Sequence, residues 1–327
     1  MSPTTRPRRS EVRAPFERVG LVVNPTAGGS RAAAVGRDVA ADLREREIAY
    51  VDLSAPTGAR AVEQVRDAVR ADAVDRVVVV GGDGMVNLGV NALAGTGVPL
   101  VIVPAGTGND TAVALGVPLG DPRAALDLML TGVTHTVDAA RVTGPAGEQS
   151  WFVGVLAGGF DAIVNERANA MRWPRGSAKY TLAALRELPV FRPIPYRITI
   201  DGVAFDGGAM LVAVANATSY GGGMKVVPSA AVDDGLLDVL ILGPLSTPTF
   251  VRVFPKVFSG RHVTHPAVRV IRGRHVELDA RGIVAYADGE RVGALPRTID
   301  VVPGAMRMVG ARRRPGAAPS TTTPAAP

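Results

Sequence analysis

Two apolar runs that each end in glycines decide the fold: Val77-Val78-Val79-Val80-Gly81-Gly82-Asp83-Gly84 and Val101-Ile102-Val103-Pro104-Ala105-Gly106-Thr107-Gly108-Asn109-Asp110. Each run reads as a buried strand followed by a glycine-rich turn. Because the carboxyl ends of parallel strands meet at one edge of a sheet, we expect both turns to present backbone N–H groups there. Such an edge binds phosphate groups, and Asp83 is placed to reach a metal ion or a phosphate-bound water. The two runs therefore predict a nucleotide site.

The rhythm of strands and helices predicts two domains. From residue 18 to 137 strands alternate with helices, which indicates an α/β, doubly wound parallel sheet. From 138 to 310 strand-like stretches follow one another with turns such as Asp201-Gly202 and Asp288-Gly289 between them. This region reads as a mainly antiparallel, β-sandwich-like domain with helical interludes over 162–188 and 248–258. The pattern allows the last strands of this region to return to the first domain.

Length and composition bound the class of protein. A chain of 327 residues suggests two domains. It has no cysteine and no apolar leader that resembles a signal peptide, which predicts a reducing, cytoplasmic setting. No apolar run approaches the roughly 20 residues of a membrane-spanning helix, so contact with lipid would be peripheral, at the inner face of the membrane.

The basic charge of the chain is partly a property of its ends. The formal net charge is +6, which suits a phosphorylated ligand, an anionic membrane surface or nucleic acid. Much of this charge lies in a Pro/Thr-rich leader over 1–17 and a Pro/Ala/Thr-rich tail over 311–327, and we predict that both are disordered. We expect no nucleic-acid partner.

A third loop, Asn24-Pro25-Thr26-Ala27-Gly28-Gly29-Ser30, leads from the first strand into a helix. Backbone N–H groups at a helix start form an anion site, although a plain helix cap has the same composition. Neither a GxGxxG nor a GxxxxGK[ST] pattern occurs, and no lysine lies in the first 178 residues. Dehydrogenase and P-loop classes are therefore disfavoured, while three loops at one sheet edge still indicate a phosphate-bearing ligand.

Acidic side chains gather at two places in the second domain. The stretch Pro228–Asp238 carries three carboxylates, which suit Mg²⁺ or an ordinary Asp-Gly turn before a strand. Asp288-Gly289-Glu290 suits a hairpin turn with a solvated Glu, or a turn that presents Glu290 as a general base. The residues alone leave both pairs of alternatives open.

The whole combination resembles the diacylglycerol kinase catalytic family, which includes soluble bacterial lipid kinases and sphingosine kinases. The similarity covers 18–309. The matching stretches, in chain order, are Asn24–Gly28, Gly81–Gly84, Pro104–Asp110, Gly158–Asp161, Gly176–Tyr180, Pro228–Asp238 and Asp288–Glu290.

The resemblance implies a lipid kinase with its active site in the cleft between the domains, using ATP and Mg²⁺ on a lipid presented at a membrane surface. Glu290 and Asp83 would be catalytic, Glu290 as the base and Asp83 by placing Mg²⁺ and the triphosphate. The carbonyls of Ala231 and Leu236 and the carboxylate of Asp234 would form a structural Mg²⁺ site. The nucleotide would contact Asn24, Pro25, Thr26, Ala27, Gly28, Ser54, Gly82, Asp83, Gly84, Met85, Asn87, Thr107 and Asn109.

Two positions depart from the family pattern. Met85 stands where threonine is usual and Leu88 where glutamate is usual, while Asn87 is retained. The leading hypothesis is an ATP-dependent kinase that phosphorylates diacylglycerol or a related lipid. An NAD kinase, which shares the GGDG element, and a nucleotide- or lipid-binding regulator without turnover are the alternatives. The acceptor lipid stays open, and strand edges in the second domain allow a homodimer.

Overall fold

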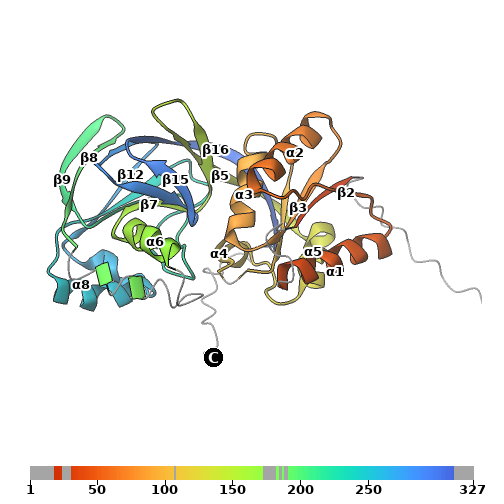
Figure 1. The fold of residues 1–327 in the computed structure, drawn as a ribbon, viewed down its shortest axis with the longest axis horizontal. Coiled ribbons are helices and arrows are strands. Elements are labelled where there is room, and N and C mark those ends of the chain that lie inside the picture. The colour runs from red at the N-terminus through yellow and green to blue at the C-terminus, as the bar shows by residue number, and fades with distance from the viewer. Residues whose placement is uncertain are drawn as a thin grey trace, which may run out of the picture.

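The first domain is a parallel sheet with helices on both faces (Figure 1). The computed structural model describes residues 18–23, 31–106, 108–171, 182–183, 186–187 and 191–312. The strands β1 (Val19–Val23), β2 (Tyr50–Asp52), β3 (Arg76–Gly81) and β4 (Leu100–Pro104) run parallel in the order β2-β1-β3-β4. All four valines from Val77 to Val80 are 0% exposed, as expected of a central strand covered on both faces.

Helices cover this sheet in pairs. They are α1 (Arg31–Glu45), α2 (Gly58–Arg70), α3 (Asp83–Leu93), α4 (Asp110–Ala114) and α5 (Pro122–Thr131). Helix α1 packs against α5 on one face, and α2 packs against α3 on the other. Capping side chains start two of the helices, since Thr57 accepts from the Arg60 N–H and Asp121 from the Ala124 N–H. The predicted doubly wound α/β domain is confirmed; α5, which follows the Gly/Pro-rich stretch 116–121, was not predicted.

The second domain is a sandwich of antiparallel sheets, as predicted. One layer contains β16 (Arg297–Gly310), β13 (His275–Asp279), β8 (Ile194–Ile200) and β9 (Val203–Ala209), with β5 (Val133–Thr143) and β6 (Gln149–Phe152) joined through β16. The other has the order β12 (Val268–Gly273), β11 (Leu237–Leu242), β10 (Leu211–Ala215), β7 (Val155–Gly159), β14 (Val284–Ala287) and β15 (Glu290–Ala294). Fully buried side chains such as Phe152, Leu156, Leu278 and Ile299 form one core cluster with residues of both sheets. Alternating inward and outward positions along the strands produce this core.

Short helices cover the outer face of the second sheet. They are α6 (Phe160–Ala170), α8 (Thr247–Val253) and the 3₁₀ helices η2 (Phe254–Val257) and η3 (Arg261–Thr264). Phe160, Phe250 and Val257 pack with strand residues in a third apolar cluster. In the described part of the chain, no helix is long and apolar enough to cross a membrane.

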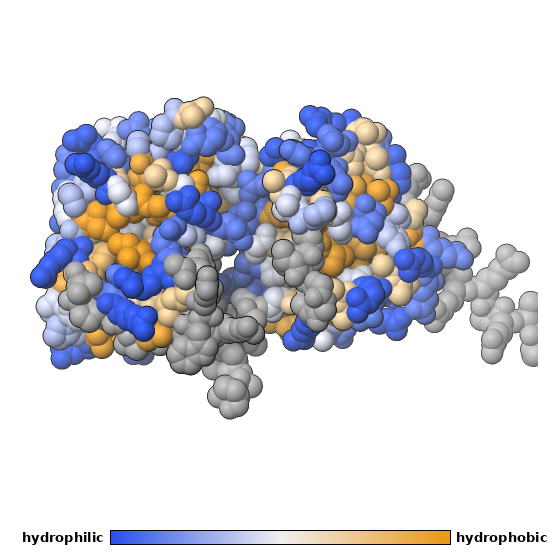
Figure 2. Space-filling view, viewed as in Figure 1, coloured by the Kyte–Doolittle hydropathy of each residue, from blue (hydrophilic) through white to orange (hydrophobic). Residues whose placement is uncertain are grey.

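Strand β16 links the two domains. It pairs with β5 along its length and, through Met308, with Leu100 of β4, so one sheet continues from the first domain into the second. The pairing of β16 with β5 shifts register between Val302 and Met306, where Pro303 lacks an N–H and Gly304 has a φ of 62°. Figure 2 shows the result as two lobes with a hollow between them.

Candidate active site

The two glycine-rich turns of the first domain touch at the carboxyl edge of its sheet. Gly82 caps α3 after β3, and Gly106 follows β4. A Cβ on Gly82 would lie 3.0 Å from the Cα of Gly106, so a side chain at this position would push the turns apart. The Ala105 N–H donates to the Gly81 carbonyl oxygen at 2.9 Å, which continues the strand pairing up to the turns. The second turn therefore lies beside the amino end of α3, where unpaired N–H groups favour an anion.

Asn109 holds the second turn closed. Its backbone is left-handed, with a φ of 57°, a conformation that asparagine tolerates better than most residues. Its side-chain Oδ1 accepts from the Gly106 N–H at 3.2 Å, and its Nδ2 donates to the Gly106 carbonyl oxygen at 2.8 Å. The side chain predicted to contact a nucleotide is thus occupied in shaping the turn.

Asp83 lies between the two turns. Its Oδ2 is 2.5 Å from the place where a Cβ on Gly108 would stand, and its Oδ1 accepts from the Thr111 N–H at 3.4 Å. Burial raises the pKa of Asp83, the nearby charge of Asp110 raises it further, and backbone N–H donors lower it. A carboxylate that is costly to ionise beside another acid is stabilised by a bound cation.

Glu290 comes from the other domain to the same place. It begins β15, directly after the turn that ends β14. A Cβ on Gly84 would lie 2.8 Å from Oε1 of Glu290. The structure therefore brings the carboxylate of Glu290 against the residue next to Asp83. This is the proximity of Glu290 to the Asp83 turn that the catalytic prediction requires.

The turn that carries Glu290 is anchored by Asp288. The carboxylate of Asp288 accepts from three consecutive backbone N–H groups, those of Val153 (3.1 Å), Gly154 (3.3 Å) and Val155 (3.0 Å). Burial raises the pKa of Asp288 to about 6, although the three N–H donors oppose that shift. A side chain on Gly154 would overlap Oδ1 of Asp288, so glycine at this position makes the contact possible. Sequence reasoning saw only an Asp-Gly turn here, and the anchoring role depends on a loop far away in the chain.

Part of the predicted nucleotide site lies outside the described residues, namely Asn24, Pro25, Thr26, Ala27, Gly28 and Thr107. Ser54 is described and lies beside the point where that loop begins. Its Oγ accepts from the Val23 N–H at 2.9 Å, and its own N–H donates to Oδ1 of Asp52 at 2.9 Å. Ser54 therefore fixes the end of β1 immediately before residue 24.

Met85 and Leu88 point into the core of the first domain. Met85 is 5% exposed and packs under Gly81, and Leu88 is 8% exposed and approaches Gly58 of α2. The prediction that Met85 contacts the nucleotide finds no support in this position. Equally, the two departures from the family pattern place no apolar side chain between Asp83 and Glu290.

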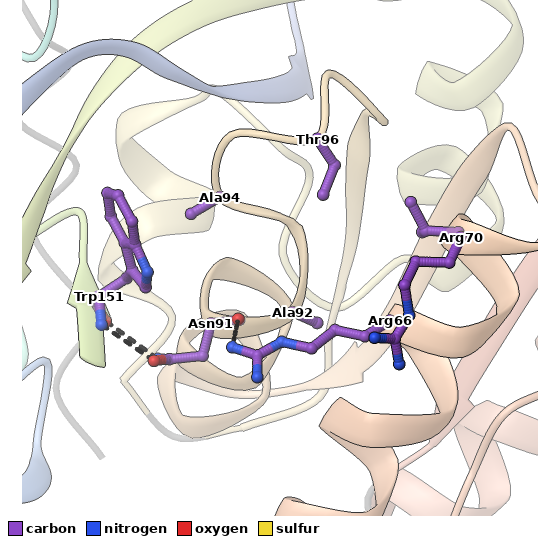
Figure 3. Close-up of a pocket in the computed structure, with 8 residues that line it drawn as sticks. Arg66, Arg70, Asn91, Ala92, Ala94, Thr96 and Trp151 are labelled. Carbon is purple, nitrogen blue, oxygen red and sulfur yellow. Dashed lines mark hydrogen bonds between the residues drawn. The ribbon is translucent and has the colours of Figure 1, made fainter. Parts of the chain in front are cut away.

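Helix α3 is fixed to the second domain by an asparagine (Figure 3). Oδ1 of Asn91 accepts from the Trp151 N–H at 2.9 Å, and Nδ2 donates to the Trp151 carbonyl oxygen at 2.9 Å. Asn87, predicted as a nucleotide contact, directs its Nδ2 to the same carbonyl oxygen at 3.5 Å. A cavity of about 230 Å³ lies beside these contacts, between α2, α3 and Trp151. The contact positions the helix that carries Asp83.

The loop predicted to hold a structural cation contains Asp234, whose Oδ1 accepts from the Leu236 N–H at 3.1 Å. Arg272 forms an ion pair with Asp234 and lies 3.3 Å from Oδ1 of Asp238. Apart from this ion pair with Arg272, no described residue hydrogen-bonds the buried carboxylate oxygens of Asp238. Burial raises the pKa of Asp238, and the charge of Arg272 lowers it.

The carboxylates of Asp234 and Asp238 face the single guanidinium of Arg272, so net negative charge remains there. Carboxylate oxygens are ligands that suit a hard cation such as Mg²⁺. Among the described residues, no three acidic or histidine side chains converge on one point. The ligand set of Ala231, Asp234 and Leu236, with two carbonyls and one carboxylate, stays a prediction. Asp138 shapes this loop from outside, because its carboxylate accepts from the Gly235 N–H (2.7 Å) and the Gly304 N–H (2.8 Å).

Asp110 also connects the two domains, and sequence reasoning did not predict this contact, whereas Asn216 makes its contacts within the second domain. Asp110 accepts from the N–H groups of Gly222 (2.7 Å) and Gly223 (2.9 Å). The fully buried Asn216 donates to the carbonyl oxygens of Asp138 (3.0 Å) and Val153 (2.9 Å). The run Gly221–Gly223 was the available signal in the sequence, because consecutive glycines favour the positive φ that all three adopt.

Comparison with known proteins decides the family. A profile described as the diacylglycerol kinase catalytic domain matches residues 18–142, and one described as the YegS C-terminal NAD kinase beta sandwich-like domain matches 154–310. A diacylglycerol kinase of Mycobacterium tuberculosis is 38% identical over 296 residues, which span 90% of this chain and 96% of that protein. The chain belongs to the diacylglycerol kinase family. The resemblance predicted from its motifs is confirmed.

Other relatives of this kinase agree in sequence and in fold. A diacylglycerol kinase of Bacillus subtilis is 30% identical over 226 residues, 68% of this chain and 73% of that protein. A crystal structure of a diacylglycerol kinase from Bacillus anthracis is 26% identical, with a TM-score of 0.71 over 91% of this chain and 98% of that one. The chain is thus an enzyme of the lipid kinase class, and its likeness to NAD kinases lies in the sandwich fold that the second profile names.

Proposed function

We propose that this kinase transfers the γ-phosphoryl group of ATP to the hydroxyl group of diacylglycerol or a related neutral lipid. One observation carries the proposal. The carboxylate of Glu290, delivered by the second domain, lies against Gly84 of the first domain, beside Asp83. The sheet edge proposed to bind phosphate and the candidate base come from different domains and meet there, as a transfer between two bound substrates requires.

The first domain would hold the nucleotide. Backbone N–H groups at Gly82 and Gly84 lie at the amino end of α3, where a triphosphate is stabilised without a lysine. The predicted loop from Asn24 to Gly28, whose approach Ser54 fixes, and Thr107 would complete this site. Asp83 would hold the Mg²⁺ that accompanies the triphosphate, and the cation would neutralise charge on the phosphoryl oxygens.

The second domain would supply the base. In the transfer step the lipid hydroxyl oxygen forms a bond to the γ-phosphorus, and the bond from the γ-phosphorus to its bridging oxygen breaks. The hydroxyl proton passes to the carboxylate of Glu290, and ADP leaves with the electron pair of the broken bond. An ordinary carboxylate suffices because phosphoryl transfer demands little proton removal early in the step.

Asp234, with the carbonyls of Ala231 and Leu236, would hold the second, structural Mg²⁺. The loop that carries Asp234 is held to β16 through Asp138, whose carboxylate accepts from the N–H groups of Gly235 in the loop and Gly304 in β16. A cation there would stiffen the loop before β11 and not act in the chemical step.

The positions of Met85 and Leu88 favour turnover over a binding-only regulator. Both side chains are buried in the core of the first domain. The methionine and the leucine therefore do not block the contact between Glu290 and Gly84. Asp83, Asp110, Asp234 and Glu290 are all retained.

The test is an assay of purified protein with ATP, Mg²⁺ and diacylglycerol in mixed micelles, followed by mass spectrometry of the lipid product. We expect phosphatidic acid, and a total lipid extract in place of diacylglycerol identifies the preferred acceptor. Failure to phosphorylate any neutral lipid, with ATP still raising the melting temperature, would favour the regulator. NADP formation from NAD would favour the NAD kinase alternative.

A further inference from the structure

A long stretch of the second domain carries cations and no carboxylate. From Val239 to Val276 there is no Asp or Glu. The lysine and arginine residues in the stretch are Arg252, Lys256, Arg261, Arg269, Arg272 and Arg274. Excess positive charge confined to one continuous segment indicates an anionic partner more strongly than the same charge spread over a surface.

Within this stretch α8 and η2 leave large apolar side chains in solvent. The segment buries Phe250, Val253 and Val257 against the sheet, at 6%, 6% and 8% exposure. On its outer side Val251 (54%), Phe254 (43%) and Phe258 (52%) are exposed. Two exposed phenylalanines four residues apart are unusual for a solvated helix and mark an interaction surface.

Cations surround these apolar side chains. Arg252, Lys256 and Arg261 are exposed on the same segment. We call the six residues Val251, Arg252, Phe254, Lys256, Phe258 and Arg261 the α8 face. Figure 1 places α8 at the lower edge of the β-rich domain, and Figure 2 shows orange and blue residues side by side along that edge.

The α8 face is firmly attached to the domain. Phe254 stacks on Phe250, with ring centroids 5.7 Å apart and planes at 16°, and Phe250 meets Phe160 edge-on at 5.1 Å. Phe160 is the first residue of α6 and directly follows β7. A chain of aromatic rings therefore connects the exposed surface to the core.

We propose that the α8 face docks on the surface of an anionic phospholipid bilayer. Phenylalanine and valine side chains enter the boundary between headgroups and acyl chains, while the flanking cations contact lipid phosphates. A second copy of the chain is a poor occupant, because two faces with cations and no carboxylate repel each other. The inference rests on the proposed function, since a kinase whose acceptor is dissolved in a bilayer must reach that bilayer.

The test measures co-sedimentation with vesicles of equimolar phosphatidylcholine and phosphatidylglycerol, and with vesicles of phosphatidylcholine alone. Arg252→Glu with Lys256→Glu removes charge, and Val251→Ser with Phe258→Ser removes apolar area. Matched controls on the same domain are Arg281→Glu and Val203→Ser, both at exposed positions outside the α8 face. Thermal melting confirms that each variant is folded.

We expect the wild type to bind the anionic vesicles at least roughly 10-fold better than the neutral ones. The charge variant should lose that preference, the apolar variant should bind more weakly at any salt concentration, and the controls should bind like the wild type. Phosphorylation of a short-chain diacylglycerol, assayed below its micelle concentration, should stay within about 2-fold for all variants, because only surface docking is lost.

Unchanged vesicle binding by folded α8 variants, equal loss in the controls, or absence of wild-type binding would overturn the proposal. So would weaker turnover of the dissolved lipid, since the face would then act in the chemical step. Tight binding of single-stranded RNA that the same substitutions abolish would assign the face to nucleic acid. Sedimentation does not require turnover, so a failure of the proposed kinase activity remains distinguishable from a failure of docking.

Discussion

Glycine at position 84 leaves room for the carboxylate of Glu290. The residue is exposed on the first turn of α3, where alanine would ordinarily favour the helix. A methyl group there would meet Oε1 of Glu290 at 2.8 Å, which is too close for a carbon and a carboxylate oxygen. The carboxylate would have to move away from Asp83.

We predict that Gly84→Ala lowers kcat on the order of 100-fold while the melting temperature stays close to that of the wild type, because a displacement of about 1 Å suffices for such a loss. Steady-state kinetics with diacylglycerol measures the effect. Gly58→Ala is the control, since its added Cβ has no neighbour closer than 3.8 Å in the first turn of α2. Equal kcat values for the two variants would contradict the proximity of Glu290 to α3.

His275 provides a pH-dependent contribution to stability away from the site. Its Nδ1 lies 2.8 Å from Oδ1 of Asp300 across the β13–β16 pair, and this hydrogen bond raises the pKa of His275. A raised folded-state pKa means that the stabilisation is complete below the unfolded-state pKa near 6.5 and is lost as pH rises through the folded-state value.

His275→Gln should therefore lower the free energy of unfolding by a few tenths to about 1 kcal/mol near pH 6, and by less near pH 9, because the pair is partly exposed. Urea unfolding at the two pH values measures this. In an Asp300→Asn background the same substitution should show a smaller pH dependence, because only the 3.5 Å contact of His275 with Glu277 then raises the pKa of the histidine. A larger loss at the higher pH would reverse the sign and contradict the account.

At the scale of elements, the contact between α3 and β6 decides where Asp83 lies. Asn91 satisfies both the N–H and the carbonyl of Trp151, much as a neighbouring strand would. Replacement by leucine keeps the size of the side chain and leaves these backbone groups unpaired.

We expect Asn91→Leu to lower the free energy of unfolding by about 1–3 kcal/mol. Asn87→Leu is the comparison. It removes the 3.5 Å contact with the same carbonyl and the 3.0 Å hydrogen bond that Oδ1 of Asn87 accepts from Nδ2 of Asn91. It should cost less than half as much, because the Trp151 carbonyl and Nδ2 of Asn91 keep their own 2.9 Å hydrogen bond. Urea unfolding of both variants gives the two values. A smaller loss for Asn91→Leu than for Asn87→Leu would show that the amide pairing does not hold the helix.

The sequence was sufficient to predict the strands, the glycine turns and the two domains, because these follow from local periodicity. Gly82 and Gly106 could be expected at one sheet edge from the order of strands alone. Asp288 could not be given its role, because the three N–H groups that it binds belong to residues 153–155. Met85 was assigned to the nucleotide because it stands at the family's usual threonine position, whereas the helical turn directs it into the core.

At the scale of the whole molecule, the two domains share a sheet and are joined again at the site. Strands β5 and β16 form the common frame, and the N–H groups of Gly222 and Gly223 that Asp110 binds add a second contact between the domains. Sequence periodicity showed that the strand pattern changes near residue 137 and allowed the last strands to return to the first domain, but it did not show that β16 pairs with β4 at Leu100. Such pairings depend on which sheet edges remain free after both domains have formed.

The central claim is that Asp83 and Glu290 serve one reaction from opposite sides of a crevice. The most direct measurement compares Glu290→Gln with the wild type in two readouts, the rate of lipid phosphorylation and the rise in melting temperature caused by ATP and Mg²⁺. We predict a rate loss of roughly 100-fold to 10,000-fold with the nucleotide-induced rise preserved, because glutamine keeps the shape of the side chain and cannot accept the proton. A variant that phosphorylates lipid at the wild-type rate would contradict the claim.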